Sequence, residues 1–300
     1  MTRTWTGSNG GLDWALSLDR GDLLPGRLVD GVLRATARKA VDGRGVIATL
    51  RGVEHWRYEV PTSDGKTTTT SVHTGREDLP LVPVRLAGAL SLAPGETRDL
   101  PFQLPVPPLG PPTVLAEDAG VDWTLEVKLD REGGFDAGIE VPVQINQPVA
   151  LLRAGVVPVG EFALFEAAGG DEAGTLEGTA ELDPVPLAAG SPFTGRVILR
   201  TPSPVSVRSI RGELKVRVEA TVGGGLKQTL TAWSTTIAGS TTVEDGQAFD
   251  IAGVLDAGVP PTVDLPHGRV SARFELILDR AFRPDLRLGR DIAVATTLEL

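Results

Sequence analysis

The tetrapeptide Pro-Pro-Thr-Val occupies residues 111–114 and again residues 260–263, with a separation of 149 residues in a chain of 300. Two consecutive prolines hold the backbone extended and supply no amide donors, so they do not fit the middle of a hydrogen-bonded sheet. We therefore predict that Pro111, Pro112, Pro260 and Pro261 mark corners where the chain crosses between sheets. The recurrence also raises the question of whether one folding unit occurs twice.

Further matches flank the two tetrapeptides in the same order along each half of the chain. They are Leu18-Asp19 with Leu182-Asp183, Gly26 with Gly190 and Gly31 with Gly195, all separated by 164 residues; Arg51-Gly52 with Arg211-Gly212, separated by 160; and Leu129-Asp130-Arg131 with Leu278-Asp279-Arg280, separated again by 149. Several ordered matches with shared separations predict an internal duplication.

The hydrophobic pattern of each half is typical of β-strands. Apolar and polar residues alternate in "WTLEVKLD" (123–130) and "LKVRVEATV" (214–222), which is the period of a half-buried strand. Turn signals separate such runs, as at Asp64-Gly65 and at 223–225. The sequence therefore predicts an all-β fold.

In this prediction two tandem immunoglobulin-like β-sandwich domains arise from the duplication. The first covers residues 1–148 and the second covers residues 176–300, with a partly packed linker at 149–175. The Gly-rich acidic stretch 166–174 is the expected mobile piece of that linker.

The chain is acidic, with a formal net charge of −10, and neither half carries a basic excess. Nucleic-acid binding is disfavoured because it draws affinity from neutralising phosphates. The chain has no cysteine, which removes disulfides and thiolate chemistry and favours a reducing compartment. It also shows neither a signal peptide nor a transmembrane segment. We expect a cytoplasmic protein.

The order of these motifs resembles the arrestin-like superfamily, in which each domain opens with Leu-Asp, Pro-Gly and Gly at fixed spacing. Leu18-Asp19, Pro25-Gly26 and Gly31 fit that pattern, and Pro101-Phe102 with the Pro-Pro-Thr at 111–113 fits a later one. The second half keeps Gly190 but has Asp250-Ile251 in place of Pro-Phe. Bacterial sporulation-control-type proteins are the most similar in style.

The resemblance implies the two-sandwich fold and a non-enzymatic adaptor role more strongly than any particular activity. The α-arrestins carry Pro-Pro-x-Tyr tails that recruit ubiquitin ligases, and this chain has a single tyrosine, Tyr58, outside any such motif. The phosphate-sensing lysines of receptor arrestins have no match in this sequence, so that activity does not carry over.

Catalytic and metal-binding motifs are weak. The three histidines, His55, His73 and His267, lack partners at metal-ligand spacing, and no Gly-x-Ser-x-Gly elbow occurs. Gly65-Lys66-Thr67 resembles the end of a phosphate-binding loop, but Val60 stands where the first glycine of that motif belongs. We therefore predict neither an enzyme nor a cofactor or metal site. The charge clusters in "REDLPLVPV" (76–84) and "AEDAG" (116–120) are interpreted as solvated turns.

The leading functional hypothesis is a cytosolic scaffold or adaptor that binds an unknown protein through sandwich edges and concave faces. A carbohydrate- or small-ligand-binding sandwich is the alternative, which the aromatic content of 5% disfavours, and a hydrolase built on loops is a third. The Thr-rich strand at 66–74 is the candidate edge, through Thr67, Thr68, Thr69, Thr70 and Val72, and it could also form a homodimer. Trp5 is a further candidate partner contact. The alternative for 66–74 is an interior strand covered on both sides.

Overall fold

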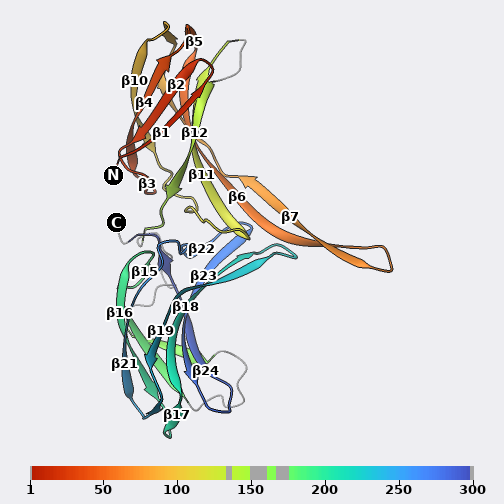
Figure 1. The fold of residues 1–300 in the computed structure, drawn as a ribbon, viewed down its shortest axis with the longest axis vertical. Coiled ribbons are helices and arrows are strands. Elements are labelled where there is room, and N and C mark those ends of the chain that lie inside the picture. Colours follow the sequence, from red (N-terminus) through yellow and green to blue (C-terminus); the bar gives the residue numbers. More distant parts are fainter. Residues whose placement is uncertain (1, 133–136, 149–160, 167–175, 298–300) are drawn as a thin grey trace. The chain divides into compact units, whose positions relative to one another are not determined.

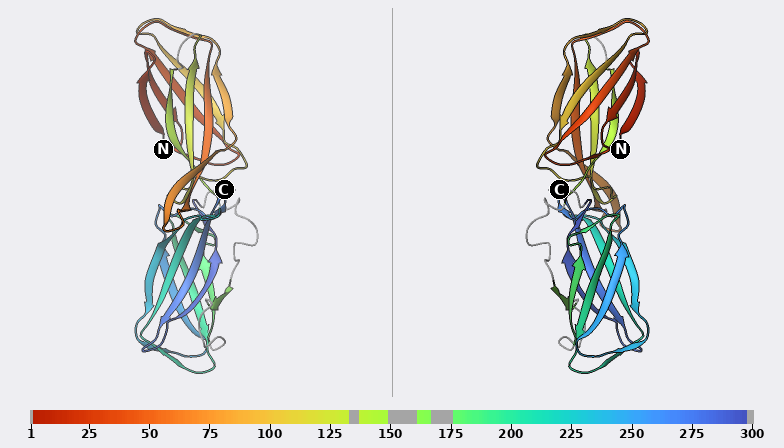
Figure 2. Two further views of the ribbon diagram at one scale, coloured as in Figure 1. Left: turned by 90° about the vertical axis from the view of Figure 1, so that its right-hand side faces the viewer. Right: turned by 90° about the vertical axis from the view of Figure 1, so that its left-hand side faces the viewer.

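The computed structural model describes residues 2–132, 137–148, 161–166 and 176–297. All secondary-structure elements within these ranges are β-strands, which confirms the all-β class. The chain divides into two compact units (Figures 1 and 2), and each is described by itself. The first unit comprises Met1–His55, Thr74–Leu115 and Gly120–Asn146; the second comprises Trp56–His73, Ala116–Ala119 and Gln147–Leu300.

The strands up to residue 148 begin and end as follows: β1 (Arg3–Asn9), β2 (Leu12–Leu18), β3 (Asp22–Leu23), β4 (Leu28–Ala37), β5 (Val41–Gly43), β6 (Gly45–Ser63), β7 (Thr68–Asp78), β8 (Val82–Ala87), β9 (Leu90–Leu92), β10 (Thr97–Pro105), β11 (Ala119–Asp130) and β12 (Ala137–Ile145).

The later strands are β13 (Phe162–Glu166), β14 (Glu177–Asp183), β15 (Leu187–Ala188), β16 (Pro192–Arg200), β17 (Val205–Val207), β18 (Ser209–Ala220), β19 (Lys227–Ala238), β20 (Thr241–Val243), β21 (Gln247–Val254), β22 (Val263–Asp264), β23 (Gly268–Asp279), β24 (Leu286–Ile292) and β25 (Val294–Ala295).

Two sheets make up most of the first unit. One has the order β1-β2-β4-β10, and the other has the order β3-β12-β11-β6-β7 with β8 beside β6. Alternate residues of β2, β4, β11 and β12 are buried, as the sequence pattern predicts. Gly7 of β1 lies against the side chain of Ile139 of β12, so the buried faces of the two sheets meet. This arrangement is consistent with a β-sandwich.

The second unit has one large sheet with the order β19-β18-β23-β24-β13-β14-β16-β21. Strand β13 joins its two parts, because Phe162–Leu164 pair with β14 and residues 165–166 pair with β24. It lies within the stretch predicted as a partly packed linker. Except for Glu166, the predicted mobile stretch 166–174 lies outside the described residues.

The two Pro-Pro-Thr-Val segments make the same pair of hydrogen bonds. The Thr113 amide donates to the Ile145 carbonyl at 2.8 Å, and the Ile145 amide donates to Thr113 Oγ1 at 2.8 Å. Likewise, the Thr262 amide donates to the Val294 carbonyl at 2.9 Å, and the Val294 amide donates to Thr262 Oγ1 at 3.1 Å. The prolines that precede each threonine lie outside the strands, where their missing amide hydrogen costs no ladder bond.

Gly26 and Gly190 also occupy matching turns, which follow Pro25 and Ala189. Their φ angles are 74° and 72°, in the left-handed region that favours glycine. The Gly26 amide donates to the Val106 carbonyl at 3.1 Å, and the Gly190 amide donates to the Leu255 carbonyl at 3.2 Å.

Strand registers agree as well across the two units. The rows of three directly paired residues are Leu18, Gly31 and Phe102 on β2, β4 and β10, and Leu182, Gly195 and Ile251 on β14, β16 and β21. These are the positions that the sequence comparison aligns.

One further correspondence is not visible as a sequence motif. The Arg44 amide donates to the Asp130 carbonyl at 2.8 Å, and the Arg208 amide donates to the Asp279 carbonyl at 2.7 Å. In each case the guanidinium also binds the carboxylate of the same aspartate.

The proposed match of Gly52 with Gly212 is not repeated in these contacts. Gly52 makes room for the ring of Trp123 on β11, whereas Gly212 makes room for the ring of Trp233 on β19. Strands β11 and β19 hold different places in their sheets, so the two glycines serve different neighbours.

Candidate functional site

Strand β7 is the terminal strand of its sheet. The sheet order ends at β6-β7 (Figure 1). Strand β8 pairs with β6 rather than with β7. Among the strands that the structure describes, β6 is therefore the one partner of β7. This topology places residues 68–70 and Val72 on an edge and not in the interior of a sheet.

The hairpin that carries β7 closes through a hydrogen-bonded turn. Asp64 Oδ1 accepts hydrogen bonds from the amides of Lys66 at 2.9 Å and Thr67 at 2.7 Å. These two backbone donors, from Thr67 and then Lys66, lower the pKa of the Asp64 carboxyl. The Asp64 amide donates to the Thr67 carbonyl at 3.2 Å, so Thr67 belongs to the turn and β7 begins at Thr68.

The register decides which backbone groups of β7 face the open edge. Asp64 bonds to Thr67 at one end, and the Leu79 amide donates to the Gly52 carbonyl at 2.9 Å at the other. Both bonds fit a single antiparallel register, in which odd-numbered residues of β7 bond to β6. The even-numbered residues direct their amides and carbonyls outward: Thr68, Thr70, Val72, Thr74, Arg76 and Asp78.

Side-chain contacts along the hairpin agree with that register. The hydroxyl of Thr69 donates to the Thr62 carbonyl at 3.4 Å, and the hydroxyl of Ser71 donates to the Val60 carbonyl at 3.5 Å. Tyr58 stacks on His73 with ring centroids 5.8 Å apart. Thr69 thus faces β6, and its direct neighbour Thr70 faces the open edge.

Strand β7 is exposed on both of its faces. Every residue from Thr68 to Asp78 is exposed except Gly75, which is half-buried, and the side chain of Val72 is 48% exposed. The other side of β6 is occupied, because the Glu59 amide donates to the Gly224 carbonyl at 2.8 Å and the Leu226 amide donates to the Arg57 carbonyl at 3.0 Å. The outer edge of β7 is therefore the free side of this ribbon.

Several other terminal strands are protected by proline or bury side chains, although β1, like β7, contains no proline and no fully buried residue. In β10 the Ala37–Glu96 and Arg27–Val106 bonds direct even-numbered residues to β4, so Pro101 and Pro105 face outward and remove two edge donors. Strands β19 and β21 each bury side chains on one face, including Trp233 and Ile251. Residues 68–78 contain no proline and bury no side chain.

The charged run Arg76-Glu77-Asp78 was predicted to be a solvated turn, and that prediction is wrong. These residues continue β7 to Asp78, whose Oδ1 accepts a hydrogen bond from Arg51 Nη2 at 2.7 Å. Charged side chains are tolerated there because an exposed edge strand has no core face to bury. The outward-facing residues therefore continue past the predicted edge at 66–74, to Arg76 and Asp78.

Trp5 lies on β1 in the first unit, paired with Leu16 and half-buried. The Arg3 guanidinium stands 5.4 Å from the centroid of its ring, a cation–π contact. The ring is thus partly covered by its own chain.

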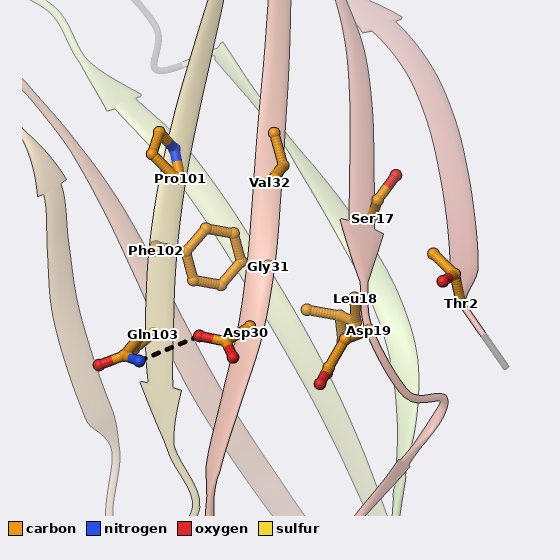
Figure 3. A pocket seen from close by; sticks show the side chains of 10 residues that line it. All are labelled: Thr2, Ser17, Leu18, Asp19, Asp30, Gly31, Val32, Pro101, Phe102 and Gln103. Atoms are coloured by element: carbon orange, nitrogen blue, oxygen red, sulfur yellow. Dashed lines mark hydrogen bonds between the residues drawn. The ribbon is translucent and has the colours of Figure 1, made fainter.

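A shallow hollow of about 660 Å³ opens on the sheet β1-β2-β4-β10 (Figure 3). Its polar lining includes Ser17, Asp19 and Asp30, and Gln103 Nε2 donates to Asp30 Oδ1 at 3.0 Å. Phe102 is the one aromatic residue among those that line it. Carbohydrate sites use aromatic faces to cover sugar rings, so the hollow lends the small-ligand alternative little support.

Comparison with known proteins leaves the arrestin-like resemblance as a hypothesis. A scan against protein-family models finds no matching family, and a search of curated proteins finds no significant match. Within the described ranges, no helix has the length and apolar character needed to cross a membrane.

Proposed function

We propose that this protein is a non-enzymatic scaffold or adaptor that binds a protein partner by addition of a strand to β7. The open outer edge of β7 carries this proposal. Six residues direct backbone donors and acceptors outward from it, none of them is proline, and both faces of the strand are exposed. An incoming extended segment would gain a ladder of main-chain hydrogen bonds, each worth about 0.5–1.5 kcal/mol net.

In this proposal the scaffold is a cytosolic, arrestin-like pair of immunoglobulin-like sandwiches produced by duplication. The matching bonds of Thr113 and Thr262 support the duplication, as do the matching turns at Gly26 and Gly190. The lack of cysteine supports a reducing compartment. In the proposed role, each sandwich provides a rigid frame that holds a strand edge in a defined geometry.

The test is affinity capture from the native host with three forms of the protein. Thr70→Pro removes one outward amide donor without removing a bond to β6, and Thr70→Ala is the control that keeps the amide. Partners should be retained by the wild type and by Thr70→Ala and lost with Thr70→Pro. Hydrogen exchange should show protection of the amides of Thr68, Thr70 and Val72 in the recovered complex. Full retention of partners by a folded Thr70→Pro protein would overturn the proposal.

A further inference from the structure

We infer that the segment added to β7 is the β7 strand of a second copy of this chain, paired antiparallel about a two-fold axis at Val72. This inference rests on the proposed function, since it names the partner of the same edge. It follows from the direction of the backbone groups, from the order of charges along the strand and from the exposure of the ribbon.

The outward direction of the even-numbered residues limits the possible registers. Antiparallel strands bond when two residues exchange amide and carbonyl groups, so an even-numbered residue must face an even-numbered residue. With Val72 opposite Val72, Thr70 lies opposite Thr74 and Thr68 lies opposite Arg76. Successive allowed registers differ by a shift of two residues, because a shift of one would place an inward-facing residue at the edge.

Charge selects among these registers. With Val72 on the axis, Lys66 of each copy lies opposite Asp78 of the other, so an opposite-charge pair closes each end of the ladder. A shift in one direction places Lys66 opposite Arg76, a like-charge pair. A shift in the other direction pairs Thr68 with Asp78 along the whole of β7, but it places Lys66 opposite Pro80 and forms no opposite-charge pair between the two strands. Of these three registers, the one on Val72 is the one that places opposite charges at both ends.

Local charge also permits self-association at this edge. The whole chain carries a formal charge of −10, which opposes contact between copies. Residues 66–78 contain two basic residues, Lys66 and Arg76, and two acidic residues, Glu77 and Asp78, so this segment is formally neutral with His73 uncharged.

Pairing between two copies would also supply the missing neighbour on the outer side of β7. Strand β7 buries no side chain and pairs with β6 alone among the described strands, so a further strand on its outer edge would add main-chain hydrogen bonds where no core face supports the sheet. Two copies joined at β7 form the order β6-β7-β7-β6, in which each formerly open edge is paired. The threonines at 68, 70 and 74 bring β-branched side chains to the new cross-strand contacts, where they pack well.

The first test measures the oligomeric state by sedimentation. The wild type should show a concentration-dependent dimer that Thr70→Ala retains. Thr70→Pro should weaken the dimer roughly tenfold or more, since each copy loses one edge donor. A wild type that remains monomeric up to high concentration would overturn the dimer. The scaffold proposal would then be tested by the capture experiment alone, in which binding of a different protein should still be lost with Thr70→Pro.

The second test reads the register with single cysteines, which is clean because the natural chain contains none. In Val72→Cys the two sulfurs come from directly opposed residues, with Cα atoms about 5.5 Å apart, a distance suited to a disulfide. In Thr70→Cys the two cysteines lie four residues out of step, about 13 Å apart. Mild oxidation should give a covalent dimer with Val72→Cys and little with Thr70→Cys. Equal cross-linking of both variants would overturn the register.

Discussion

The ring of Phe102 lies directly over Gly31, and a Cβ atom at residue 31 would stand 2.4 Å from Cζ of that ring. The two residues are paired across β4 and β10, so the glycine makes space for the aromatic side chain. The φ angle of Gly31 is not in the left-handed region, so close approach and not backbone conformation requires glycine there. Gly195 holds the corresponding place opposite Ile251.

Gly31→Ala should destabilise the protein by about 1–3 kcal/mol, because the added methyl group overpacks a site closed by a large ring. Urea denaturation measures the change in the free energy of unfolding. The double variant Gly31→Ala/Phe102→Leu should lose less than the sum of the two single changes. Gly88→Ala is the matched control, since an added Cβ atom there meets nothing within 4 Å. Equal losses at Gly31 and Gly88 would contradict this interpretation.

Thr113→Val and Thr262→Val should each cost about 1–3 kcal/mol of stability, because each leaves a strand amide without its acceptor. The affected donors are the amides of Ile145 and Val294. Thr113 is only 7% exposed, so water does not replace the lost oxygen easily. Thermal or denaturant unfolding followed by circular dichroism measures both variants. Thr→Ser at the same positions should restore most of the loss, and a Ser variant as weak as the Val variant would argue against the hydrogen bond.

Trp123→Phe should loosen the Pro-Pro-Thr-Val segment at 111–114 and lower the free energy of unfolding by about 1 kcal/mol. The Trp123 indole Nε1 donates to the Pro111 carbonyl at 3.2 Å, and phenylalanine removes this donor while keeping most of the buried ring. Amide hydrogen exchange around residues 111–114 should become faster relative to the wild type. A change in global stability with no change in local exchange would show that ring volume, and not the hydrogen bond, carries the effect.

The turn at Asp64 should loosen in acid. The pKa of this carboxyl is lowered by the amides of Thr67 and Lys66, so its ionised form is the one that the folded turn binds. This contribution is fully present above the usual carboxyl pKa and is lost as the pH falls through the lowered value. The amide resonances of Lys66 and Thr67 should shift together at a pH below about 3.9, the usual carboxyl pKa. Asp64→Asn should abolish that transition, and a midpoint at or above the usual pKa would contradict it.

Local patterns along the chain were sufficient to predict the all-β class and the hairpin turns. Alternation in 123–130 and 214–222 reflects a strand with one face in a core, and that pattern is complete within each segment. The hairpin turns at Asp64-Gly65 and at 223–225 are confirmed for the same reason. Glycine acts through its own backbone, and the structure places Gly26 and Gly190 in turns with φ angles of 74° and 72°.

Contacts between distant segments needed the tertiary structure. Arg44 binds Asp130 in the same way as Arg208 binds Asp279. A single arginine before a strand is not a recognisable motif, so these equivalent contacts become visible only when the fold brings each arginine to its aspartate. The extent of β7 is a similar case. Arg76-Glu77-Asp78 reads as a turn in isolation, and it becomes a strand because β6 continues beside it.

By itself the sequence determined that residues 68–74 would be extended, threonine-rich and free of proline, because these properties depend on the residues alone. Only the tertiary structure decided that this strand ends its sheet, since that depends on β8 pairing with β6. It also decided that Thr70 faces outward and Thr69 inward, because the hairpin register sets the direction of every amide. A strand is an edge when no other strand pairs with its outer side, and this pairing depends on how distant segments of the chain pack together.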